Sequence, residues 1–190
     1  MLPWLLIQGF RAVGRTRQLV EMSENLPLMK HAAALVARRA YSRGELRRAL
    51  ADRQRTGDID DIEAVLDRLE ELKLLNDDEF AYNFSFYRMK ELGWGEEKVL
   101  AALLYKDVAK TVAKRALDRV REEIAPDGAN VALMEYVESY CRKHGAPSTL
   151  KDAQKLARRL AGRGFDEADI VGALRRLITP DIFRHFIAGD

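Results

Sequence analysis

Apolar residues recur at intervals of three and four along most of the chain, which is the spacing of one face of an α-helix. A clear example is the stripe formed by Leu46, Ala49 and Leu50. Long alternating runs of Val, Ile and Thr, which are typical of strands, do not occur. The composition agrees with this pattern, because Ala, Leu, Arg and Glu dominate and only 5 prolines are present. The pattern therefore predicts an all-α protein.

The apolar stripes fall into three successive groups, each with three helices. In the first group, Ser42 and Glu45 form an S-x-x-E capping box at the start of the second helix. In the second group, Gly93-Trp94-Gly95 interrupts the chain between the first and second helices, so we assign these three residues a structural role. The predicted organisation is an N-terminal segment, three repeats and a C-terminal tail, with these boundaries: 1–27; 28–75, 76–126 and 130–179; 180–190.

The first and third groups resemble one another most closely. Leu46-x-x-x-Leu50-Ala51-x-Arg53 matches Leu156-x-x-x-Leu160-Ala161-x-Arg163. A repeat of about 50 residues is typical of helical arrays, in which each unit contacts mainly its neighbours. We therefore expect an elongated array of three tandem three-helix repeats, and we expect it to be a monomer. The alternative is one bundle whose amphipathic helices resemble each other only because they share a period.

The first ten residues, MLPWLLIQGF, are apolar but lack the basic start and the cleavage site of a secretory signal. Two interpretations stay open for this segment. It is either an extra segment that docks on the body of the protein, or translated sequence upstream of a true start at Met22. No apolar run is long enough to span a bilayer, so no membrane association is expected.

Motifs for catalysis, cofactor binding or metal binding are absent. The sequence has no glycine-rich phosphate loop, and its three histidines are far apart. The single cysteine, Cys141, excludes a disulfide framework and a cysteine-rich zinc site, and it fits a reducing compartment. Beside Val137 and Tyr140 it is best interpreted as a small core residue. We expect no enzymatic activity, no cofactor and no metal.

Charge is balanced overall but unevenly distributed. The 32 basic and 30 acidic residues give a formal net charge of +2, while the second helices of the first and third repeats are rich in arginine and lysine. These charges form either ordinary solvated faces or a discontinuous basic surface for an acidic partner or for phosphates. Aromatic residues are also crowded on one helix, from Phe80 to Tyr87. For them we favour packing between repeats over stacking on bases.

Several motifs follow one another along the chain: Ala37-Arg38-Arg39-x-Tyr41-Ser42-Arg43-x-Glu45-Leu46, then Val65-Leu66-Asp67-x-Leu69, then Leu74-Leu75-x-Asp77-x-x-Phe80-Ala81, then Gly93-Trp94-Gly95, then Arg163-Gly164-Phe165. Their order and spacing resemble the RecX family of regulatory proteins. The match extends over about Leu28 to Leu177. The chain departs from the family where Tyr82 and Phe86 replace basic residues and where Asp107 replaces a glycine-containing turn.

The resemblance implies a bacterial cytoplasmic regulator that binds the RecA recombinase filament on single-stranded DNA. It would inhibit RecA recombinase, ATPase and SOS activities, and some family members bind DNA directly. Basic second helices would then make the contacts, and we select as partner-binding candidates Arg43, Arg47, Arg48, Lys155, Arg158 and Arg159. The rival hypotheses are an independent helical module that binds single- or double-stranded DNA, and a plain scaffold.

Overall fold

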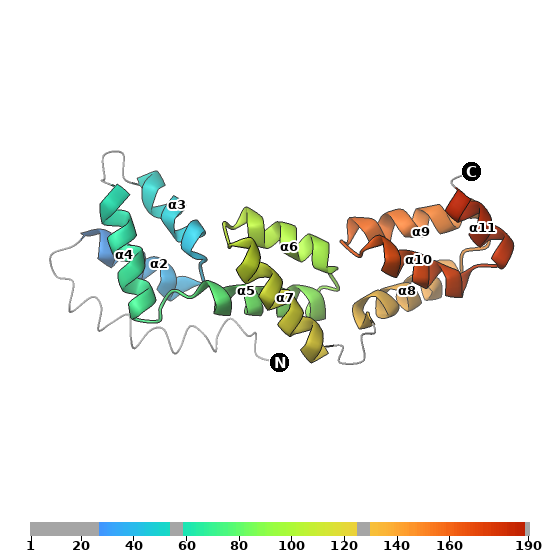
Figure 1. Cartoon of the computed structure of the whole chain (residues 1–190), viewed down its shortest axis with the longest axis horizontal. Coiled ribbons are helices and arrows are strands. Elements are labelled where there is room, and N and C mark those ends of the chain that lie inside the picture. The colour runs from blue at the N-terminus through green and yellow to red at the C-terminus, as the bar shows by residue number, and fades with distance from the viewer. Residues whose placement is uncertain (1–26, 54–58, 125–129, 189–190) are drawn as a thin grey trace. The chain divides into compact units, whose positions relative to one another are not determined.

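The computed structural model describes residues 27–53, 59–124 and 130–188, and every regular element within these ranges is a helix (Figure 1). The all-α prediction is confirmed for this part of the chain. The N-terminal segment, apart from Pro27, lies outside the described residues. So do residues 54–58 and residues 125–129, which include the predicted boundary between the second and third repeats.

The described helices include the segment with the Leu46–Leu50 stripe, and the helix that carries it begins directly after the capping residue Ser42. The elements are α2 (Pro27–Arg38), α3 (Arg43–Arg53), α4 (Ile59–Glu71), α5 (Asp77–Phe86), the π-helix η1 (Tyr87–Glu91), α6 (Glu96–Tyr105), α7 (Lys110–Ile124), α8 (Val131–His144), α9 (Leu150–Gly162), α10 (Glu167–Leu177) and α11 (Pro180–Ala188). A π-helix continuing α5 was not expected from the sequence.

The chain divides into two compact units, and the first unit contains α2, α3 and α4 together with Leu104–Val112. The three helices pack on one another around an apolar core. Its largest fully buried side chains come from the predicted stripes: Leu46, Leu50, Leu66 and Leu69. The capping box is present, because Ser42 Oγ accepts the Glu45 N–H at 3.1 Å and Glu45 Oε2 accepts the Ser42 N–H at 3.4 Å.

The second unit contains the second half of α5, all of η1 and most of α6 and α7, followed by α8 to α11. Helices α8, α9 and α10 enclose a second core around Leu156, Leu160 and Leu174. The segment 180–190, expected only as a C-terminal tail, forms α11 as far as Ala188. Apolar side chains of α11 pack against this core, namely Ile182, Phe183 and Phe186. The period of the Pro180–Ala188 segment could have indicated a helix, but the segment is too short to be distinctive.

The turn after α6 and the turn after α9 each contain a residue with a positive φ angle. Asp107, after α6, has φ of +57°, and Gly164, after α9, has φ of +84°. Both values lie in the left-handed region, which glycine occupies most readily and aspartate tolerates better than most residues. In each case the next side chain, Val108 or Phe165, is buried. Asp107 thus adopts the conformation for which a glycine-containing turn would otherwise be used.

Each of these turns accepts hydrogen bonds from the start of a helix within the same unit. Ser42 Oγ donates to the Lys106 carbonyl at 2.5 Å. The Gly95 N–H donates to the Arg163 carbonyl at 2.8 Å, and the Glu97 N–H donates to the Gly164 carbonyl at 3.2 Å. Lys106 lies three residues after Leu103 of α6, and Arg163 lies three residues after Leu160 of α9, so the two occupy equivalent positions. Tandem repeats would produce this shared construction, although the three-repeat array itself stays a prediction.

Replacing Gly95 with alanine is expected to destabilise the protein by about 1–3 kcal/mol, because the added Cβ would overlap the backbone of Gly164. Backbone cannot move aside as a flexible side chain can. The matched control is Gly172→Ala in the middle of α10, where the added Cβ meets nothing within 4 Å. The free energy of unfolding of this control should rise by about 0.5–1 kcal/mol. Urea unfolding of both variants measures the difference, and equal effects would contradict the close approach.

Candidate partner-binding surfaces

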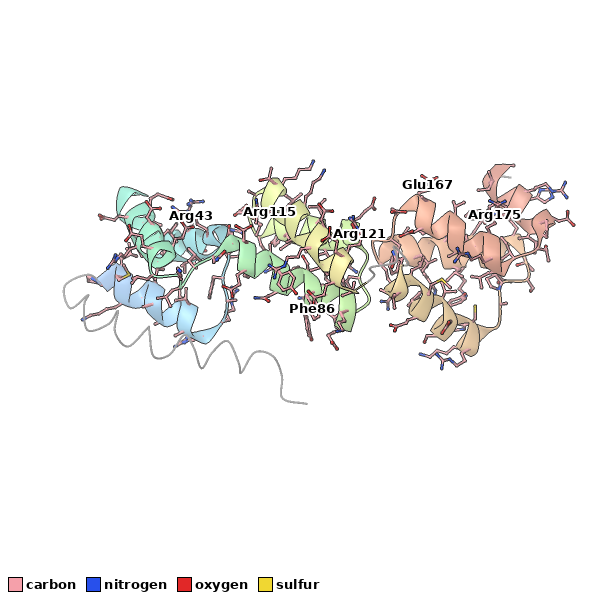
Figure 2. All side chains as sticks on the ribbon, turned by 60° about the horizontal axis from the view of Figure 1, so that its bottom comes forward. Arg43, Phe86, Arg115, Arg121, Glu167 and Arg175 are labelled. Atoms are coloured by element: carbon pink, nitrogen blue, oxygen red, sulfur yellow. The ribbon has the colours of Figure 1, made fainter. Side chains whose placement is uncertain are left out.

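Arg43 lies at the start of α3, where its guanidinium meets three carboxylates of α4 (Figure 2). Its Nη2 is 2.8 Å from Glu63 and 2.6 Å from Asp67, and its Nη1 is 2.8 Å from Glu70. Glu63, Asp67 and Glu70 stand at i, i+4 and i+7, so they share one face of the helix; we call them the α4 acidic face. Burial alone would lower the pKa of Arg43, but its hydrogen bonds to Asp67 and Glu63 raise it above the usual value.

Arg47 lies one turn further along α3 and binds Glu63 with two hydrogen bonds. Arg47 Nε is 2.5 Å from Oε1, and Nη2 is 3.0 Å from Oε2. Paired bonds of this kind are stronger than a single contact because the geometries of the two groups match. Hydrogen bonds from Arg47 and then from Arg43 lower the pKa of Glu63 from 4.5 to about 2. The positive charge of Arg47 is therefore largely balanced by Glu63.

Arg48 is held at the turn after α6 rather than by α4. Its Nε is 2.9 Å from the Asp107 carboxylate, and its Nη2 donates to the Tyr105 carbonyl at 3.0 Å. The guanidinium also lies 5.8 Å from the centre of the Tyr105 ring, which is 80% exposed. Of the three candidates on α3, Arg48 is the most open to solvent, with 49% of its side chain exposed.

The candidates on α9 have a different environment. Lys155, Arg158 and Arg159 are all exposed, and none of them forms an ion pair with a carboxylate of the described residues. Arg158 Nε donates to the Gln154 carbonyl at 3.3 Å, and the Arg159 guanidinium lies 5.5 Å from the centre of the Tyr140 ring. With Lys151 these residues form one face of α9, which we call the α9 basic face. Its charge is available to a partner.

The structure thus separates the six candidates into two sets, three in each unit. The sequence showed which residues are basic but not which of them are paired. The acidic spacing of Glu63, Asp67 and Glu70 beside Arg43 and Arg47 was a signal that could have indicated the pairing, since it places opposite charges on facing helices.

Gly93, Trp94 and Gly95 form the break between η1 and α6. Gly93 has φ of +60°, and the Trp94 N–H donates to the Arg88 carbonyl at 3.0 Å. The Trp94 ring has the Arg88 guanidinium 4.6 Å from its centre and the Lys98 ammonium 4.5 Å from it. The sequence drew attention to this turn but not to the cations around it.

Aromatic residues of α5 and η1 also lie against cations. Tyr82 and Phe86 have ring centres 6.1 Å apart, with Arg119 over Tyr82 and Lys90 over Phe86. Tyr87 is 44% exposed. Some of these rings are therefore accessible rather than fully used in packing.

Among the described residues, no group of three or more His, Cys, Asp and Glu side chains is placed to hold a metal ion. Cys141 is partly buried and packs against the second core. The helices in the described ranges include none with the length and apolar character needed to cross a membrane.

The sequence is similar to several proteins named "Regulatory protein RecX". The protein from Chromohalobacter salexigens is 37% identical over 71% of this chain and 82% of its own length. The one from Mycolicibacterium vanbaalenii is 32% identical over 73% and 77%, and one from Thermus thermophilus is 31% identical over 72% and 82%. No family model matches the sequence.

The fold is similar to a solved structure, the crystal structure of RecX from Lactobacillus salivarius. The TM-score is 0.62 with 18% sequence identity, and the match covers 85% of this chain and 95% of that one. At this identity the likeness concerns the fold.

The substitution Glu63→Gln should lower the free energy of unfolding at neutral pH, because it removes a carboxylate bound by two arginines. The pKa of Glu63 is lower in the folded protein, so its contribution is complete above pH 4.5 and is lost as the pH falls toward about 2. The difference between the two proteins should therefore shrink as the pH is lowered through that range. Urea unfolding at a series of pH values measures it.

The control for this prediction is Glu71→Gln on the same helix. Within the described residues Glu71 pairs with Arg68 alone, and its side chain is 64% exposed. An exposed ion pair of this kind contributes little to stability. Glu71→Gln should therefore lower the free energy of unfolding less than Glu63→Gln does. A pH-independent difference for Glu63→Gln would contradict the prediction.

Proposed function

The chain belongs to the RecX family of regulatory proteins, and on this basis we propose that it binds the RecA filament on single-stranded DNA and inhibits RecA. Inhibition would extend to the recombinase, ATPase and SOS activities of RecA. The protein would act without catalysis or a cofactor, as a monomer in the bacterial cytoplasm.

The observation that best supports a partner-binding role is the α9 basic face. Lys155, Arg158 and Arg159 are exposed and have no carboxylate partner among the described residues. A cation that is already unpaired can bind an acidic group without first losing an internal ion pair. Placed along a repeating filament, several weak contacts of this kind would add up through their high effective concentration.

The pairing on α3 assigns its arginines a second, structural role. For Arg43 to bind a partner, it would have to leave three carboxylates of the α4 acidic face. The substitution Arg47→Glu would place a second carboxylate beside Glu63 and destabilise the fold. Lost inhibition in that variant would therefore not by itself identify Arg47 as a contact residue. We therefore place the main contact on α9, with Arg48 as the more open contributor from α3.

The test is RecA's ATP hydrolysis on single-stranded DNA, measured while the protein is added well below one copy per RecA. We expect hydrolysis to fall at these ratios, because one bound molecule can restrain a filament of many subunits. The double reversal Lys155→Glu, Arg158→Glu should raise the concentration for half-inhibition by about tenfold or more, since it makes the contact face repulsive.

The matched control is Arg175→Glu, Arg176→Glu on α10, which changes the charge by the same amount in the same unit (Figure 2). Both arginines are exposed. Equal loss of inhibition in the two double variants would contradict the assignment to α9. No effect of the unsubstituted protein on RecA from the same organism would contradict the proposed function.

A further inference from the structure

Three cations surround the turn that carries Trp94. The Arg88 guanidinium and the Lys98 ammonium lie 4.6 and 4.5 Å from the centre of its ring. Arg163 reaches the same turn from the end of α9, where its Nη1 is 3.3 Å from the carbonyls of Leu92 and Gly93. We call Arg88, Trp94, Lys98 and Arg163 the Trp94 cluster; all four lie within the second unit.

Arg88 has donors that the protein does not use. Its Nε is buried without a hydrogen-bond partner, and its guanidinium is positioned by the rings of Phe84, at 5.1 Å, and Trp94. A buried donor left without a partner is costly, so such groups are rare in folded proteins and call for an explanation. Arg88 also lies in the π-helix η1, and short π-helices are frequent at functional sites.

The cluster contains no counter-charge. Within the described ranges, no carboxylate forms an ion pair with Arg88, Lys98 or Arg163. Lys98 Nζ donates only to the Gly162 carbonyl, at 3.3 Å. Elsewhere in the same unit Arg121 is bound by Glu96 through two hydrogen bonds of 2.6 Å (Figure 2). The cations of the Trp94 cluster thus differ from Arg121, because an aromatic ring and backbone carbonyls hold them instead of a carboxylate.

We propose that the Trp94 cluster binds a phosphate of single-stranded nucleic acid. Arginine and lysine side chains that alternate with aromatic rings are the composition that single-strand-binding surfaces use. Arg88 and Lys98 would bind the phosphate, because the guanidinium offers free donors and both charges lack a carboxylate. Trp94 holds the two cations in place and faces the bound strand.

A second pair of rings in the same unit lies outside the Trp94 cluster. Tyr82 and Phe86 lie 6.1 Å apart, and each ring has a cation over it, Arg119 and Lys90 respectively. The proposal does not depend on RecA. Failure to bind nucleic acid would leave the proposed inhibition of RecA standing, and failure to inhibit RecA would leave this proposal standing.

The experiment uses the full chain with Trp4→Phe, which leaves Trp94 as the only tryptophan of the two in the sequence. A short oligothymidylate is added without RecA, and the emission of Trp94 is followed. We expect a saturable change whose midpoint moves to higher DNA concentration as salt is raised, because binding a phosphate releases counterions. A duplex of the same length should bind less tightly, since its bases are not free to stack.

In this background Arg88→Gln and Lys98→Gln should each weaken binding by about five- to tenfold and reduce the salt slope by about 0.7, the value for one phosphate contact on a single strand. Arg88→Lys keeps the charge and should restore part of the affinity. The matched control is Lys90→Gln, which removes one charge from the same π-helix but from beside Phe86. Circular dichroism verifies that each variant keeps its helicity.

Several outcomes would overturn the proposal. They are no change in Trp94 emission with oligothymidylate, equal weakening by Lys90→Gln, and a poly-glutamate peptide that binds the cluster more tightly than the oligonucleotide. The last result would assign the site to an acidic protein segment instead. If Arg88→Gln does not fold, Lys98→Gln decides the matter, because Lys98 gives up only one long hydrogen bond and its contact with the Trp94 ring.

Discussion

Helix ends leave backbone groups without intrahelical partners, and the way this chain satisfies them determines much of its structure. The starts of α3 and α6 direct donors at turns that follow other helices: Ser42 at Lys106, and Gly95 at Arg163. These bonds require two chain segments to approach at backbone distance. A small residue at the helix start and a left-handed residue in the turn make the approach possible, as at Gly95 and Gly164.

Similar sequence patterns on α3 and α9 have different electrostatic outcomes. Arg43 and Arg47 face the α4 acidic face and are paired within the chain. At the places where the third repeat aligns with these two arginines, α9 has Ala153 and Ala157, which pack against an apolar core that α11 also joins. The basic residues that remain on α9 point to solvent. A regulator that binds an acidic or phosphate-rich partner is therefore better served by α9 than by α3.

The second unit contains two contrasting ways of holding a cation. Arg121 is matched by a carboxylate on a neighbouring helix, whereas Arg88 and Lys98 are matched by the ring of Trp94. A ring positions a cation without neutralising it, because the attraction to the ring face leaves the hydrogen-bond donors free. The same residues can therefore brace the turn before α6 and still present charge to a ligand.

The sequence by itself determined that the described part of the chain is helical, where most helices begin and end, and which family it belongs to. These properties depend on residues close together in the chain, such as the Leu46–Leu50 stripe and the Ser42–Glu45 capping box. Only the tertiary structure decided that Arg47 is paired while Lys155 has no carboxylate partner among the described residues, that Arg88 is held by Trp94, and that α11 covers a core. Each of these depends on contacts between side chains far apart in sequence, which local spacing does not specify.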